Sequence, residues 1–81
     1  MLAFVQIAVA QLRDALRHHR AARGLSHEAL AESIAAVLQA SGWEGKIPHF
    51  NTLRRFIESE TEPHETTVYA VREYLSKQVA A

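Results

Sequence analysis

The sequence predicts an all-α fold: a compact bundle of four helices with a long first helix, in a single domain spanning residues 1–81. Three observations predict it. Apolar residues recur every three or four positions along four separate segments, which is the period of amphipathic helices. Glycine and proline fall between these segments, where they end or begin helices. A chain of 81 residues also has room for only one small hydrophobic core.

The first helix is expected over about residues 2–22, roughly 30 Å at 1.5 Å per residue. Its apolar seam has spacings of three and four and consists of Leu2, Val5, Val9, Leu12 and Leu16. Gly24 suits the left-handed conformation that ends a helix, and Ser26 suits the N-cap of the next one.

The second helix is expected over about residues 26–40, with an apolar face of Leu30, Ile34, Val37 and Leu38. The stretch SGWEGK that follows is a loop because it holds two glycines, and its Trp43 is expected to fill a gap between helices.

A third helix is expected over about residues 49–59, with the apolar set Phe50, Leu53, Phe56 and Ile57. Pro63 fits the start of a fourth helix over about residues 64–78. Its buried face is expected to consist of Val68, Val71, Leu75 and Val79.

Composition narrows the classes of function. Nine basic and nine acidic residues give a formal net charge of zero, so any anionic partner must be met by a local basic patch. The absence of cysteine excludes disulfides, thiolate metal sites and cysteine nucleophiles. The N-terminal MLAFVQIAVA lacks a basic flank and is too short to span a bilayer, so we expect a cytoplasmic protein without membrane association.

The polar residues predict neither a cofactor nor an enzyme. The five histidines, at positions 18, 19, 27, 49 and 64, have no metal-ligand spacing, and His19 and His27 are expected to be packed, neutral rings. There is no nucleophile elbow, no glycine-rich phosphate loop and no carboxylate pair with an obvious pocket.

Two polar surfaces are candidates for nucleic-acid contact. On the third helix, Asn51 and Arg55 lie opposite the apolar set and Thr52 and Arg54 flank it; arginine can pair with guanine and asparagine with adenine. The alternative is a solvated polar face. On the first helix, a basic stripe of Arg13, Arg17 and Arg20 suits a phosphate backbone. The alternative there is an ordinary exposed face with Asp14 as a local ionic partner.

Two stretches resemble the lambda-repressor-like helix-turn-helix family of bacterial and phage regulators. RGLSHEALAESI resembles the family's entry into helix 2, and TLRRFIESETEPHETTVYAVREYL resembles its recognition helix, the following loop with proline and the next helix. The resemblance implies a sequence-specific transcriptional regulator that binds double-stranded DNA with its third helix in the major groove. It places His27 where family members commonly have a glutamine that contacts phosphate, and we add His49, at the start of the third helix, to the candidate contacts.

The chain departs from this family between the two stretches. Helix 2 of the family has about eight residues and a short turn, whereas here the helix continues through AAVLQASG and about a dozen extra residues precede the third helix. This insertion alters how the third helix is presented.

The first helix also predicts self-association. Its apolar arc is widened by Phe4, Ile7, Ala8 and Ala15, so we expect homodimerisation through residues 2–9, with Leu2, Val5 and Val9 as contact residues. The alternative is that the longer second helix and the Trp43 loop cover this arc. A second hypothesis for function follows: a non-enzymatic module on this scaffold that binds a protein partner.

Overall fold

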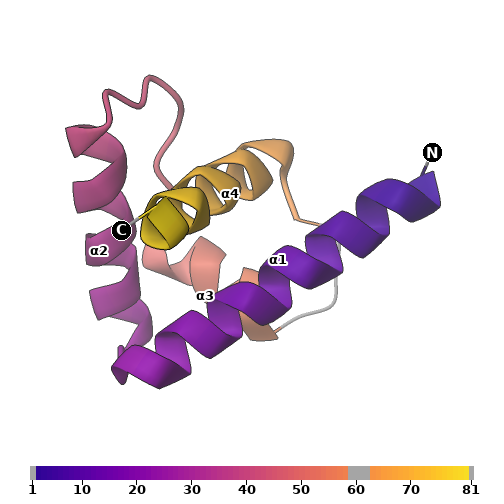
Figure 1. The fold of residues 1–81 in the computed structure, drawn as a ribbon, viewed down its shortest axis with the longest axis horizontal. Helices are drawn as coiled ribbons and strands as arrows, with labels where there is room; N and C mark the ends of the chain where they lie inside the picture. Colours follow the sequence, from indigo (N-terminus) through magenta and orange to yellow (C-terminus); the bar gives the residue numbers. More distant parts are fainter. Residues whose placement is uncertain (1, 59–62, 81) are drawn as a thin grey trace.

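The computed structural model confirms the all-α fold class and describes the backbone of residues 2–58 and 63–80 and the side chains of residues 9–58 and 63–78. Its helices are α1 (Leu2–Arg23), α2 (His27–Ala40), α3 (Phe50–Glu58) and α4 (Glu65–Ala80). No strand occurs in the described parts of the chain. Helix α1 lies across α3 and α4, and α2 packs against the same two helices from another side (Figure 1).

The ends of α1 and α2 follow from local signals in the sequence. Gly24 has a φ of 62°, and the N–H of Leu25 donates to the carbonyl of Arg20 at 3.0 Å. After α2, Gly42 has a φ of 76°, and the N–H of Trp43 donates to the carbonyl of Leu38 at 2.9 Å. Glycine adopts these conformations without steric cost, so both helices stop where a glycine stands. The Ser26 hydroxyl accepts from Ala29 N–H at 3.0 Å, which confirms the expected N-cap of α2.

The core contains the apolar faces expected for α2 and α3. Its buried members are Leu16, Leu30, Ile34, Leu38, Leu53, Phe56, Ile57, Ala70, Val71 and Tyr74. Trp43 is half-buried and packs against this core, as expected. None of the helices, over the described residues, has the length and hydropathy needed to cross a bilayer.

The buried face of α4 differs from the expected one. It is centred on Ala70, Val71 and Tyr74, whereas Val68 and Leu75 are only half-buried. The side chain of Val79 lies outside the described residues. The face shifts because α4 packs against both α1 and α2, and because the Tyr74 hydroxyl finds polar partners on those helices.

Tyr74 is the centre of a polar cluster inside the bundle. Its hydroxyl lies 2.6 Å from His19 Nε2 on α1 and 2.9 Å from Ser33 Oγ on α2. The His19 ring meets the tyrosine ring edge-on, at 5.2 Å between centroids. Burial, and then the charge of Arg23, lower the pKa of His19 from 6.5. His19 is therefore the packed, neutral ring that the sequence predicts.

Candidate nucleic-acid interface

Helix α3 is held in place by two arginines of α1. Arg13 Nε donates to the carbonyl of Phe56 at 2.7 Å, and Arg17 Nε donates to the carbonyl of Ile57 at 2.8 Å. These carbonyls belong to the last turn of α3, and the carbonyls of a last turn have no hydrogen-bond donors within their own helix. The positive charges also stabilise the negative end of the helix dipole. The two arginines thus fix the C-terminal end of α3 on α1.

This structural role of the arginines is not visible in the sequence. Arg13 is only 7% exposed and its guanidinium lies 5.3 Å from the centroid of the Phe56 ring, so it is not part of an exposed basic stripe. Arg17 keeps a 42% exposed side chain and lies 3.5 Å from Asp14, its expected ionic partner. Arg20 is half-buried, and its Nε makes no hydrogen bond within the described parts of the chain. Contact of Arg17 and Arg20 with a phosphate backbone stays a prediction.

The outer face of α3 is entirely polar. Its exposed side chains are Asn51, Thr52, Arg54, Arg55 and Glu58. Arg54 Nε lies 3.3 Å from Glu58 Oε2, a pair one helical turn apart. Arg55 has no hydrogen bond or ion pair with any described residue. The structure therefore brings Asn51, Thr52 and Arg55 together on one surface with their polar groups available.

The start of α2 lies beside this face. A groove between the two helices is lined by Ser26, His27, Glu28, Phe50, Arg54 and Glu58. His27 Nε2 is 3.7 Å from Glu58 Oε1 and makes no hydrogen bond with a described residue. Glu58 thus stands between His27 and Arg54, so two of the predicted DNA contacts share one carboxylate.

The loop after α2 returns the chain to the first half of that helix. Residues 41–49 leave the far end of α2 and descend again to α3 (Figure 1). Trp43 Nε1 donates to the carbonyl of Lys46 at 3.3 Å, which closes the loop on itself. At its end, Pro48, His49 and Phe50 line a shallow pocket together with Glu28, Ala31, Glu32 and Ala35 of α2. Helix α3 therefore begins beside the first three turns of α2.

His49 lies next to acidic side chains. It shares that pocket with Glu28 and Glu32, and its Nδ1 accepts the N–H of Asn51 at 3.3 Å. Its ring also stacks at a tilt on Phe50, with 4.5 Å between centroids. The side chain thus caps the start of α3, in addition to being a candidate contact.

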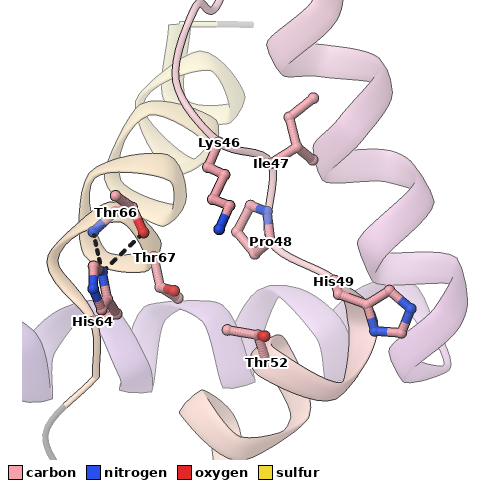
Figure 2. A pocket seen from close by; sticks show the side chains of 8 residues that line it. All are labelled: Lys46, Ile47, Pro48, His49, Thr52, His64, Thr66 and Thr67. Carbon is pink, nitrogen blue, oxygen red and sulfur yellow. Dashed lines mark hydrogen bonds between the residues drawn. The ribbon is translucent and has the colours of Figure 1, made fainter.

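A deeper pocket adjoins the other side of α3. It has a volume of about 430 Å³ and is lined by Lys46, Ile47, Pro48, His49, Thr52, His64, Thr66 and Thr67 (Figure 2). Sequence reasoning did not identify it, because its walls come from the loop, α3 and α4. Among the described residues no group of three acidic or histidine side chains is placed to hold a metal ion.

Comparison with known proteins gives no relative: no protein-family model, curated protein or solved structure matches the chain. The resemblance to helix-turn-helix regulators therefore rests on the two sequence stretches alone and stays a prediction.

Proposed function

We propose that the protein is a cytoplasmic, non-enzymatic DNA-binding regulator that places α3 in the major groove of double-stranded DNA. One observation carries the proposal: α3 exposes Asn51, Thr52 and Arg55 on one face while Leu53, Phe56 and Ile57 are buried on the other. Arginine pairs with the O6 and N7 atoms of guanine, and asparagine with N6 and N7 of adenine. An α-helix with its side chains is about 10–12 Å across, which fits a major groove about 12 Å wide.

The path of the α2–α3 loop supports this proposal. In the family that the sequence resembles, helix 2 has about eight residues and a short turn leads to the recognition helix. Here Pro48 and His49 line one pocket with residues of the first three turns of α2, from Glu28 to Ala35. The extra residues lengthen α2 and form a loop that returns the chain to the first half of that helix. The insertion therefore leaves α3 packed beside the first half of α2.

The neutral net charge requires that affinity come from a few local contacts. Arg54 and Arg55 are on the proposed face, and Arg17, Arg20, His27 and His49 are candidate phosphate contacts around it. Because Glu28, Glu32 and Glu58 are also exposed nearby, we expect modest affinity that falls steeply with added salt.

The test is a titration of the protein onto fluorescent duplexes of random and selected sequence at several salt concentrations. We expect the Arg55→Ala variant to lose about 5- to 100-fold in affinity for the selected duplex and little for the random one. The matched control is Arg72→Ala, which removes an equal charge from an exposed position on α4. Affinity weaker than about millimolar in about 50 mM salt, or affinity insensitive to salt, would contradict the proposal.

A second candidate function, a homodimerisation or protein-interaction module, is favoured by the position of α1. The N-terminal part of this helix extends past the other three helices (Figure 1). The predicted contact residues Leu2 and Val5 have side chains outside the described residues, and Val9 is half-buried and packs against the core. We propose that residues 2–9 of α1 meet a second copy of the chain.

A further inference from the structure

We propose that the pocket between Lys46, Thr52 and Thr67 binds a phosphate group. The pocket lies between the α2–α3 loop, the first turn of α3 and the N-terminus of α4 (Figure 2). The pocket shares His49 and Thr52 with the candidate DNA contacts, whereas Asn51 and Arg55 lie outside its lining. Its test with inorganic phosphate does not depend on the proposed DNA binding.

Thr67 is the first observation that points to a ligand. The residue is only 3% exposed, and its hydroxyl has no hydrogen bond with any described residue. In Figure 2 the hydroxyl is directed into the pocket. A hydroxyl group both donates and accepts hydrogen bonds, so one without a protein partner can pair with an oxygen atom of a ligand. The hydroxyl is therefore available to a partner that enters from the pocket.

The charges around the pocket specify an anion. Lys46 forms no ion pair with a described residue, and its ammonium group extends from the loop into the space beside Pro48 (Figure 2). The 16-residue helix α4 begins at Glu65 and directs the positive end of its dipole to the same place. No carboxylate is present among the described lining residues, and Glu65 lies outside the lining.

His64 adds a further donor. Its Nδ1 accepts the N–H of Thr66 at 3.4 Å, so the neutral ring carries its proton on Nε2. The Thr66 hydroxyl is 3.1 Å from the same Nδ1. An ammonium group, hydroxyl groups and an imidazole N–H match the acceptor oxygens of a phosphate. The volume of about 430 Å³ exceeds that of one phosphate, so the group can belong to a larger molecule.

The test is an NMR titration of the ¹⁵N-labelled protein with inorganic phosphate, against potassium chloride at equal ionic strength. We expect saturable shifts of the amide signals of Lys46, Thr66 and Thr67 with phosphate alone. Shifts that grow without saturation, or that chloride reproduces, would overturn the proposal.

Two variants locate the site. Thr67→Val removes the hydroxyl and keeps the shape, and Lys46→Met removes the charge from an exposed side chain without touching the core. We expect each to raise the dissociation constant for phosphate about 5- to 10-fold. The control is Lys77→Met, which removes the other lysine of the chain, near the far end of α4. It should change the dissociation constant for phosphate less than about twofold. An equal effect of the two lysine variants would contradict the assignment.

A final arm identifies the source of the phosphate. Duplex DNA is added to the protein saturated with inorganic phosphate. Release of phosphate identifies the nucleic-acid backbone as the natural ligand, and retention identifies a small phosphorylated molecule; both require the pocket. Failure to bind the duplex contradicts only the proposed function, whereas failure to saturate with phosphate contradicts only the pocket.

Discussion

At the scale of single residues, the hydroxyl group of Tyr74 joins three helices through hydrogen bonds in the interior. Tyr74 on α4 contacts His19, 55 positions earlier in the chain, and Ser33, 41 positions earlier. All three side chains are buried or half-buried, so each depends on the others for its hydrogen bonds. The cluster joins α1, α2 and α4 with directional contacts that apolar packing does not provide.

Removal of this hydroxyl tests its contribution to stability. We expect Tyr74→Phe to lower the free energy of unfolding by about 1–3 kcal/mol, because His19 and Ser33 lose their partner. Tyr69→Phe is the matched control at a 49% exposed position and should cost less than about 0.5 kcal/mol. Urea denaturation at neutral pH measures both. Equal effects of the two substitutions would disprove the role of the cluster.

The lowered pKa of His19 makes stability depend on pH. Between the pKa of the folded state and 6.5, the unfolded chain binds the proton and the folded protein does not. The free energy of unfolding should therefore decrease as pH falls below about 6.5. In His19→Gln this part of the decrease should vanish, while the contributions of the other histidines and the carboxylates remain. Urea denaturation of the wild-type protein and of His19→Gln at pH 7 and pH 5.5 measures how the free energy of unfolding changes with pH. An identical change in the two proteins would contradict this role of His19.

The partners of the polar residues in the interior could not be predicted from the sequence. Helix-stopping Gly24 and the N-cap Ser26 act within a few neighbouring residues, so the sequence predicts them. Arg13 and Thr67 are buried because of partners or pockets formed by distant segments; the hydrogen bond from Arg13 spans 43 positions. Helical periodicity places such residues beside an apolar face but does not state what they contact.

At the scale of elements, α3 depends on α1 for its C-terminal end. The helix has only nine residues, which is too short to be stable by itself. Its inner face is buried, and Arg13 and Arg17 donate to the carbonyls of its last turn. The exposed face of α3 was predictable from its periodicity, whereas this attachment was not, because the arginines lie on another helix.

Substitution of the two arginines tests the attachment. We expect Arg13→Met to cost about 2–3 kcal/mol of stability, since a buried carbonyl loses its charged donor, and Arg17→Met about 1 kcal/mol because it is more exposed. Arg23→Met, at the exposed end of α1, is the control. Amide hydrogen exchange should show the greatest loss of protection in α3. Uniform loss across all four helices would contradict a specific attachment.

At the scale of the whole molecule, the four helices enclose one core. The molecule has principal extents of 32 × 26 × 24 Å. The sequence predicts the number, order and approximate limits of the helices. The route of the α2–α3 loop is beyond it, because a loop with two glycines has many allowed paths and its packing on α2 selects one.

The proposed self-association belongs to this scale. We expect sedimentation equilibrium to give about twice the chain mass of 9.1 kDa. Val5→Lys should return the protein to the mass of one chain, because a charge in an apolar contact is costly. Gln11→Lys adds the same positive charge at an exposed position of the same helix and should leave the mass unchanged. A wild-type protein of one chain mass would contradict the dimer.

The attachment of α3 to α1 also has a thermodynamic consequence. One continuous helix carries the N-terminal segment proposed for self-association and, at Arg13 and Arg17, the contacts that orient α3. If assembly favours one placement of α1, it changes the affinity of α3 for its ligand by a given factor. The ligand must then change the assembly constant by the same factor, because coupling between two binding equilibria is reciprocal. Concentration of the protein would thus act as an effector of its own recognition surface.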